Sequence, residues 1–407
     1  MNDLKLSVIF GILSRIITFM NQILSVPLII TLIGLKEFTK YNVMTAGIAW
    51  LITLGGCLLP SIVGDIARAK SDKNGQVISQ KVSSSLALMF LFCSFIAVSY
   101  FIGFRKLSIE AHTILFFSLV IVFASTSESI RQGLGENYKN AIYNGIANLL
   151  SLIGVLSLYT FKIETNLLAI IILTLGSIMI LKILNLIQLL RFFDINNVDF
   201  MSCKDMVIKA LGFILISIAY YFNTAGLISV LGINAYKYIT EFIVLQKIVL
   251  IIMGVVVMIR NPLWSIIVKL KHEGGGRNIL KAFNKFLYIY MLMTPVIFIM
   301  LYYTVRPFVN VWAKGVTIDQ ATIISFSVYI VVVLFSYINS VLYYGLEIFN
   351  YISKVLIFEA VVNVIGVLFL SKIGAPLHSI FSLMIATSII INLKVYLLIV
   401  RTCNNVN

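Results

Sequence analysis

The stretch LSRIITFMNQILSVPLIITLIG, from Leu13 to Gly34, decides the fold of this chain. Its apolar length matches the roughly 20 residues that a helix needs to cross a bilayer core about 30 Å thick. It nevertheless contains Arg15, Asn21, Gln22 and Pro27. Because lipid offers no partners for backbone polar groups, the stretch must be helical, and its polar side chains must face protein or water.

The rest of the chain has the same apolar character. Of its 407 residues, 60% are hydrophobic and only 12% are charged, and the mean hydropathy is +1.03. Ordinary globular domains do not reach such values. We therefore predict an all-α, polytopic membrane protein with about twelve spans, which are too long and too uniformly apolar for barrel strands. The expected spans are 7–34, 41–64, 83–104, 111–131, 140–161, 166–190, 207–232, 237–260, 284–305, 320–346, 353–371 and 374–400.

The positions of lysine and arginine predict the orientation of these spans. If both termini are cytoplasmic, 20 of the 31 basic residues lie on cytoplasmic segments and 9 on the opposite side. Arg15 and Lys247 remain within the membrane. The net charge of +15 is then a signal of topology and of attraction to anionic lipid headgroups. We expect membrane lipids as partners, and no nucleic acid.

The connections between spans exclude several function classes. The longest have about 18 and about 23 residues, which leaves no room for a nucleotide-binding domain. No GxxxxGK[ST] motif occurs, and the glycine run KHEGGGRN, from Lys271 to Asn278, is predicted to be a flexible turn. The outward loops are too short for a catalytic domain. We therefore expect no enzymatic activity, no catalytic residues, no cofactor and no metal site.

Two pairs of segments about 200 residues apart suggest an internal repeat. LIGLKEFTKY (Leu32 to Tyr41) is similar to VLGINAYKYI (Val230 to Ile239), and PSIVGDIARAK (Pro60 to Lys70) is similar to PLWSIIVKLK (Pro262 to Lys271). Helix hairpins in general share some of these features. As a repeat, the pattern predicts two parallel six-helix bundles, 1–200 and 201–407, with the substrate between them.

Polar residues of the first span lie on one face. At 100° per residue, Arg15, Asn21 and Gln22 fall within an arc of about 120°. A mid-helix arginine costs about 2.5 to 3.5 kcal/mol on insertion, a cost that a hydrated cavity would relieve. Arg15 could instead extend to the cytoplasmic interface or pack within the bundle. Lys247, near the centre of the eighth span, raises the same question.

Further polar residues occur in later spans. Glu128 and Arg131 are three residues apart and can pair on a helix. Glu359 and Asn363 are four residues apart on another span. Each could be a contact between helices, which is common in membrane bundles. Together they predict a central polar cavity with basic residues, which would bind an anion such as the phosphate of a lipid-linked cargo.

The segment from Leu13 to Gly75 resembles the start of polysaccharide transporters of the multidrug/oligosaccharidyl-lipid/polysaccharide (MOP) superfamily, and in particular the O-antigen flippases of the Wzx type. The features that carry the resemblance are the polar first helix with Arg15 and Gln22, Pro27 before the Leu32 to Gly34 helix end, a glycine-rich second helix, and a basic exit containing Asp65, Arg68 and Lys70. Twelve spans and short loops extend the resemblance over the whole chain.

The resemblance implies transport of an undecaprenyl-pyrophosphate-linked oligosaccharide across the bacterial inner membrane, coupled to an ion gradient, for lipopolysaccharide biosynthesis. The pathway's polymerase and chain-length regulator would be its partners. Carried over to this chain, the cargo would contact Arg15, Asn21, Gln22, Lys247 and Arg131, and Glu128 or Glu359 would couple transport to protons or sodium. The alternatives are an ion-coupled multidrug exporter of the same superfamily and an O-antigen polymerase.

Overall fold

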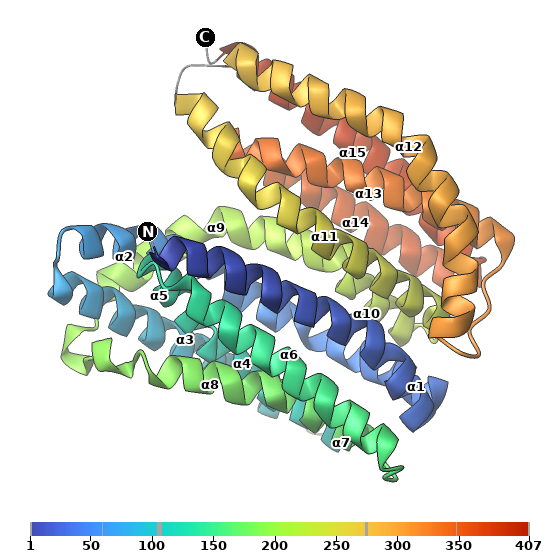
Figure 1. Cartoon of the computed structure of the whole chain (residues 1–407), viewed down its shortest axis with the longest axis horizontal. Helices are drawn as coiled ribbons and strands as arrows, with labels where there is room; N and C mark the ends of the chain where they lie inside the picture. Colours follow the sequence, from blue (N-terminus) through green and yellow to red (C-terminus); the bar gives the residue numbers. More distant parts are fainter. Residues whose placement is uncertain (1, 59, 104–107, 273–275, 347, 406–407) are drawn as a thin grey trace. The chain divides into compact units, whose positions relative to one another are not determined.

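The computed structural model describes residues 2–58, 60–103, 108–272, 276–346 and 348–405, and every regular element within these ranges is helical (Figure 1). Ten stretches among them are long and apolar enough to cross a membrane. The expected eighth span lies on a further helix, whose residues 242–259 contain a single charged residue, Lys247. The prediction of an all-α, polytopic membrane protein is therefore confirmed. The predicted glycine turn includes residues 273–275, which lie outside the described ranges.

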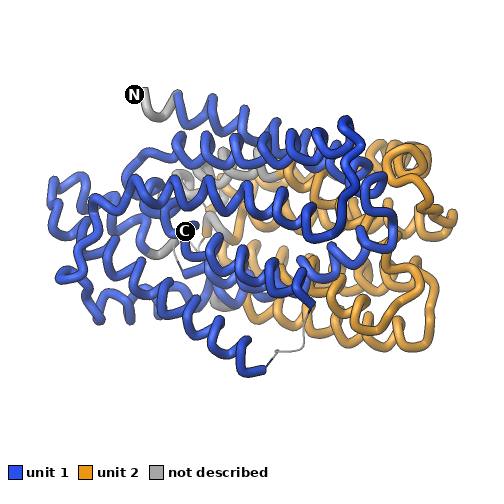
Figure 2. Tube along the Cα trace, turned by 90° about the horizontal axis from the view of Figure 1, so that it is seen from below, with its two compact units in different colours: residues 1–218 blue, residues 219–407 orange. Residues whose placement is uncertain are grey.

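The chain separates into two compact units, Met1–Ile218 (unit 1) and Ala219–Asn407 (unit 2), coloured separately in Figure 2. The boundary falls inside helix α9 (Phe200–Asn223), whereas the sequence places it at 200/201, where that helix begins. The reason lies in the packing of α9. Its residues Met206 and Ala210 belong to the buried core of unit 1, and its last turn lines a cavity of unit 2.

Unit 1 contains long helices with short helical connections between them. Its elements are α1 (Asn2–Leu58), α2 (Pro60–Ser71), α3 (Gly75–Gly103), α4 (Ile109–Ala124), α5 (Thr126–Gly133), α6 (Asn137–Thr160), α7 (Leu167–Ile171), the π-helical turn η1 (Ile172–Gly176), α8 (Ser177–Ile187), the 3-10 turns η2 (Leu190–Phe192) and η3 (Ile195–Asn197), and most of α9. The core of the unit joins α2, α3, α5 and α9 through apolar side chains that include Ile66, Val82, Ile130 and Met206.

Helix α1 consists of two of the predicted spans, joined at Gly34. The backbone of Gly34 has φ 77° and ψ 166°, a conformation that only glycine adopts at low cost. The predicted helix end at this glycine is therefore confirmed. The chain stays helical through Pro27. The N-terminal part of α1 packs along α6, where a Cβ added to Gly145 would lie 3.4 Å from the Cα of Ser14.

Unit 2 contains the end of α9 followed by six helices. These are α10 (Ala225–Ile233), α11 (Ile239–His272), α12 (Gly276–Trp312), α13 (Gln320–Leu346), α14 (Phe349–Lys372) and α15 (Leu377–Asn405). Helix α13 packs against both α11 and α15. Phe381 of α15 is fully buried and contacts Phe242 and Phe326 at ring-centre distances of 5.7 and 5.5 Å.

The predicted seventh span, 207–232, is interrupted. Thr224 has φ −129° and ψ −96° and separates α9 from α10. Its hydroxyl donates a hydrogen bond of 2.7 Å to the Tyr220 carbonyl, which satisfies one of the acceptors left free where a helix ends. The break lies among polar residues of unit 2, where an interrupted helix can be tolerated inside a membrane protein.

Candidate functional site

The polar face of α1 divides into two halves. Ser14 is buried against α6, and Asn21 donates a hydrogen bond of 3.0 Å to the Asn148 side chain of α6. Arg15 is half-buried and Gln22 is exposed. Arg15 forms no ion pair or side-chain hydrogen bond with any other described residue. One side of the predicted polar stripe, with Ser14 and Asn21, therefore packs against α6. The other side, with Arg15 and Gln22, is more exposed.

An asparagine ladder on α6 organises the polar interior of unit 1. Asn140, Asn144 and Asn148 are four residues apart and so share one face of the helix. Asn148 contacts Asn21 of α1, and Asn144 donates a hydrogen bond of 2.8 Å to the carboxylate of Glu128. The ladder connects α1, α5 and α6 through side-chain amides.

Glu128, a predicted ion-coupling residue, has a cation partner. Its Oε1 atom lies 2.8 Å from the Nζ atom of Lys182 on α8, and the same oxygen accepts the bond from Asn144. The predicted pair of Glu128 with Arg131 is wrong, because each of the two residues binds another partner instead.

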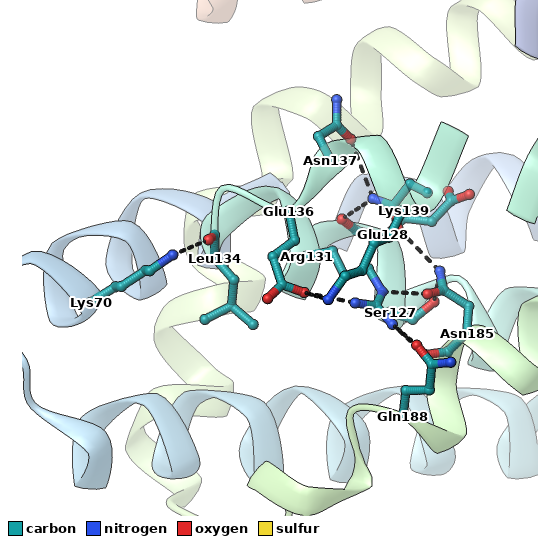
Figure 3. Close-up of polar contacts among 11 residues, drawn as sticks. Lys70, Ser127, Glu128, Arg131, Leu134, Glu136, Asn137, Lys139, Asn185 and Gln188 are labelled. Atoms are coloured by element: carbon teal, nitrogen blue, oxygen red, sulfur yellow. Dashed lines mark hydrogen bonds and ion pairs between the residues drawn. The ribbon is translucent and has the colours of Figure 1, made fainter. Parts of the chain in front are cut away.

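Arg131 is the largest fully buried side chain described in the chain, with 1% of its surface exposed. Its guanidinium donates to Glu136 Oε2 at 2.7 Å, to Gln188 Oε1 at 2.7 Å and to the Asn185 side chain (Figure 3). Asn185 in turn donates to Ser127 and to Asn140, both at 3.0 Å. The guanidinium group of Arg131 therefore holds the end of α5 against α8.

Glu136 completes this cluster from the loop between α5 and α6. Its Oε2 atom also accepts a hydrogen bond of 2.9 Å from Lys139. Partial burial raises the pKa of the Glu136 carboxyl, but Lys139 and Arg131 lower it more, so the pKa lies below its usual value of 4.5. The carboxylate is ionised at neutral pH, and the Arg131 site is electrically compensated.

Unit 2 contains a cavity of 90 Å³ whose lining combines apolar and polar side chains. Amide, hydroxyl and phenol groups make up most of its polar lining, from Tyr220, Asn223, Ser336, Asn339, Asn363 and Asn392. Many of these side chains bind each other: Asn363 donates to Asn223 at 2.8 Å, and Asn392 donates to Ser336 at 2.6 Å. No lysine or arginine is among the described lining residues.

Glu359 is the carboxylate of this cavity. Its side chain is buried, and its Oε1 atom accepts a hydrogen bond of 2.5 Å from Ser388 on α15. No ion pair links Glu359 to a described basic residue. A buried carboxylate without a cation carries either a proton or a bound cation, because desolvating a bare negative charge costs too much. The predicted Glu359–Asn363 face does line the cavity.

Lys247 lies on α11 of unit 2, and it is not among the described residues that line the cavity. Its side chain is half-buried, between the buried residues Gln246 and Ile248. Like Arg15 in unit 1, it has no carboxylate partner in the described part of the chain. Arg15 and Lys247 therefore both lie on apolar helices without a carboxylate partner among the described residues.

Sequence reasoning missed two residues that hold together the polar side chains around Glu128 and Arg131, which we call the unit 1 cluster. Lys182 and Asn185 were not singled out, because each looks like an isolated polar residue in an apolar span. The repeated spacing of asparagines in NYKNAIYNGIAN, from Asn137 to Asn148, was the signal that could have found the ladder. Within the described residues, no three His, Cys, Asp or Glu side chains are grouped so that they could hold a metal ion.

Solved structures match this architecture over the whole chain. The inward-facing conformation of a multidrug resistance MATE family transporter of the MOP superfamily shares 16% identity, covers 96% of this chain and 98% of its own, and gives a TM-score of 0.73. The outward-facing conformation of such a transporter shares 15% identity over 99% of this chain and 96% of its own, with a TM-score of 0.62.

A third structure, a MOP superfamily transporter from Pyrococcus furiosus, is described as having a binding pocket of reverse polarity that suggests a different function. It shares 15% identity over 99% of this chain and 96% of its own, with a TM-score of 0.69. This chain therefore shares the fold of these MATE and MOP transporter structures. No protein-family model and no curated protein matches the sequence.

Proposed function

We propose that this MOP-fold chain is a transporter that flips a lipid-linked oligosaccharide, of the undecaprenyl-pyrophosphate type, across the bacterial inner membrane. The observation that carries the proposal is the pair of cations without described counter-ions, Arg15 in unit 1 and Lys247 in unit 2. A membrane-embedded cation costs about 2.5 to 3.5 kcal/mol on insertion. Binding an anionic cargo would offset that cost in each unit.

A diphosphate is an anion that either cation can bind. A guanidinium or an ammonium binds such charge strongly where water is scarce, and the lipid tail of the cargo can remain in the bilayer. The neighbouring Asn21 and Gln22 supply amide groups of the kind that bind sugar hydroxyls. The solved relative with a pocket of reverse polarity supports the idea that pocket charge differs among proteins of this fold.

Alanine substitutions at the two cations test the cargo. Arg15→Ala and Lys247→Ala should abolish O-antigen display in a strain that lacks its own flippase, while membrane levels of the protein stay unchanged. Lys36→Ala on α1 and Lys237→Ala before α11 are matched controls, since both lysines are exposed. Normal O-antigen display in both test variants would refute the role of these cations.

Exchange of the two basic residue types asks whether charge or geometry matters. Arg15→Lys and Lys247→Arg should retain partial flipping of a fluorescent lipid-linked oligosaccharide in reconstituted vesicles, because the charge is kept while the hydrogen-bond geometry changes. Complete loss in both variants would indicate that bidentate contacts are required instead.

We assign ion coupling to Glu359 rather than to Glu128. Glu128 is held by Lys182 at 2.8 Å, whereas Glu359 lines the unit 2 cavity and has, among the described residues, one hydroxyl donor and no cation. A carboxylate can exchange a proton or a sodium ion during transport only if no fixed cation occupies its place. Glu359→Gln should therefore remove the dependence of transport on the ion gradient, and Glu128→Gln should not.

A multidrug exporter is the second candidate, because the described charge in the unit 2 cavity is negative and tyrosines surround it. This arrangement is typical of sites for organic cations. The cavity volume of 90 Å³ is, however, well below the roughly 300 to 1,000 Å³ of drug-sized sites. It suits an ion with a few waters. Export of cationic dyes by the chain, with loss in Glu359→Gln, would favour this candidate.

Deletion of the gene separates flipping from polymerisation. Without a flippase, single lipid-linked repeat units should accumulate on the cytoplasmic leaflet, where the polymerase and the chain-length regulator of the pathway cannot use them. Accumulation of single repeats on the outer leaflet would instead indicate that this chain is the polymerase.

A further inference from the structure

The connector between α8 and α9, residues 188–199, directs polar groups toward the protein and leaves apolar side chains exposed. Its polar groups face the protein: the backbone N–H groups of Asp194 and Asp199 donate to the hydroxyls of Ser83 and Ser84 on α3, both at 2.9 Å. Asn197 donates to the hydroxyl of Ser79 at 3.0 Å. These serines lie on one helix, so the connector is attached along α3 at several points.

The opposite side of the connector is apolar and open. Ile195 is 73% exposed, and Phe200, the first residue after the connector, is 80% exposed. Phe193 and Val198 are also exposed. Exposed apolar side chains of this kind are typical of segments that lie in the membrane interface. We therefore expect the connector to lie where acyl chains begin.

A groove runs between this apolar side and the helices of unit 1. Its volume is 350 Å³, about four times the 90 Å³ of the polar cavity in unit 2. Apolar side chains of α3, of the end of α4 and of the connector line it, among them Leu86, Phe90, Phe123, Phe193, Ile195 and Val198. The groove offers apolar contact along its whole described lining, as a hydrocarbon chain requires.

Arg191 is a basic residue between two residues that line the groove. Arg191 follows Leu190 and precedes Phe193 by two residues, and both of these line the groove. Its side chain is exposed, and its guanidinium lies over the Phe192 ring at 4.8 Å. It forms no side-chain hydrogen bond or ion pair with other described residues. The guanidinium therefore has N–H groups without acceptors among the described residues, and it belongs to a segment that lines an apolar groove.

We propose that this groove is a binding site for an anionic phospholipid, with one acyl chain between α3, α4 and the connector and the headgroup phosphate on Arg191. The occupant is a phospholipid because it is the common membrane component that combines an apolar chain with a negative group at the membrane interface. Apolar burial holds the chain, and the guanidinium selects the headgroup. This site is independent of the cargo and lies entirely within unit 1.

Native mass spectrometry of the full-length protein tests this site. Protein released from detergent should retain one phosphatidylglycerol in preference to phosphatidylcholine with the same chains. Ala87→Trp, which fills the groove from α3, and Val198→Trp, which fills it from the connector, should each reduce retention at least fivefold. Arg191→Gln should bring phosphatidylglycerol down to the phosphatidylcholine level. Val198 is exposed, so its variant keeps the test valid if Ala87→Trp does not fold.

Two control variants identify the site. Phe95→Trp places a tryptophan on an exposed part of α3 outside the groove, and Lys204→Gln removes an exposed cation of α9. Both should retain phosphatidylglycerol like the unmodified protein. Unchanged retention in Ala87→Trp and Val198→Trp would overturn the groove as the chain site. An unchanged lipid preference in Arg191→Gln would overturn the headgroup assignment.

Discussion

In unit 1, the carboxylates of Glu128 and Glu136 each lie within 3 Å of a cation, whereas in unit 2 the carboxylate of Glu359 accepts a hydrogen bond from Ser388 and has no cation partner among the described residues. Both arrangements lie in interiors of similar composition, lined by asparagine and serine. They differ in whether the negative charge is compensated by a fixed positive one. A compensated cluster has one stable arrangement, while an uncompensated carboxylate has to acquire a proton or an ion.

From this difference we expect distinct roles for the two units. The polar contacts of unit 1 join α5, α6 and α8. We expect the unit 2 cavity to hold the group whose charge changes during transport. Four changes test the contrast.

The largest expected effect is on the stability of unit 1. Arg131→Met would remove the buried guanidinium that binds Glu136, Asn185 and Gln188, and we expect it to lower the free energy of unfolding by about 3 to 5 kcal/mol. Thermal unfolding of the detergent-solubilised protein measures this. Lys139→Met is the control, because it removes only the half-exposed partner of Glu136. Equal losses in the two variants would contradict the special role of the buried guanidinium.

The next effect concerns Glu359, the buried carboxylate of unit 2 that has no described cation partner. We expect Glu359→Gln to reduce gradient-driven transport by about 5- to 150-fold, the usual range of coupling between sites. The variant should be as stable as the unmodified protein, since glutamine can still accept the Ser388 hydrogen bond. Transport in vesicles with and without an imposed ion gradient provides the readout. If Glu359→Gln transports normally under a gradient, the contrast between the units has no functional meaning.

A double-mutant cycle measures the compensation in unit 1 directly. Glu128→Gln and Lys182→Met, separately and together, should give a coupling energy of about 1 kcal/mol in the stability of the protein, because the pair is only partly buried. Neither single variant should alter gradient dependence. A coupling energy of zero would show that the two charges are held apart in solution.

The smallest effect is a pH dependence of stability at the end of α5. The pKa of Glu136 lies below its usual value of 4.5 in the folded protein. The stability that its ionised form contributes is therefore fully present above pH 4.5, and it is lost as the pH falls through the lower folded value. Unfolding measured against pH should show a fall at acid pH that Glu136→Gln lacks. The same fall in that variant would assign the effect to other carboxylates.

Hydropathy alone was enough to predict the helices, because the membrane imposes one length and one kind of backbone on every span. The break at Gly34 followed from a residue type with its own backbone freedom. The interruption at Thr224 did not follow from the sequence, because threonine is tolerated within helices and its role there depends on the carbonyl groups it meets.

Side-chain partners were harder to predict than spans. The spacing of Glu128 and Arg131 allows a pair, but spacing does not say which of several possible partners is nearer in the folded chain. Arg131 instead binds Asn185, which is 54 residues away in the sequence. Arg15 and Lys247 were easier to single out, because a charge within an apolar span is costly. Glu359 was singled out because Asn363 lies one helical turn away.

Helix α9 has a consequence for how the chain could work. Met206 on this helix is part of the core of unit 1, and Asn223, near its end, lines the cavity of unit 2. A continuous helix transmits bending and torque along its length, which a loop of the same number of residues would absorb. We therefore expect a change in the packing around Glu359 to act on α9, the helix whose earlier residues are packed in the core of unit 1.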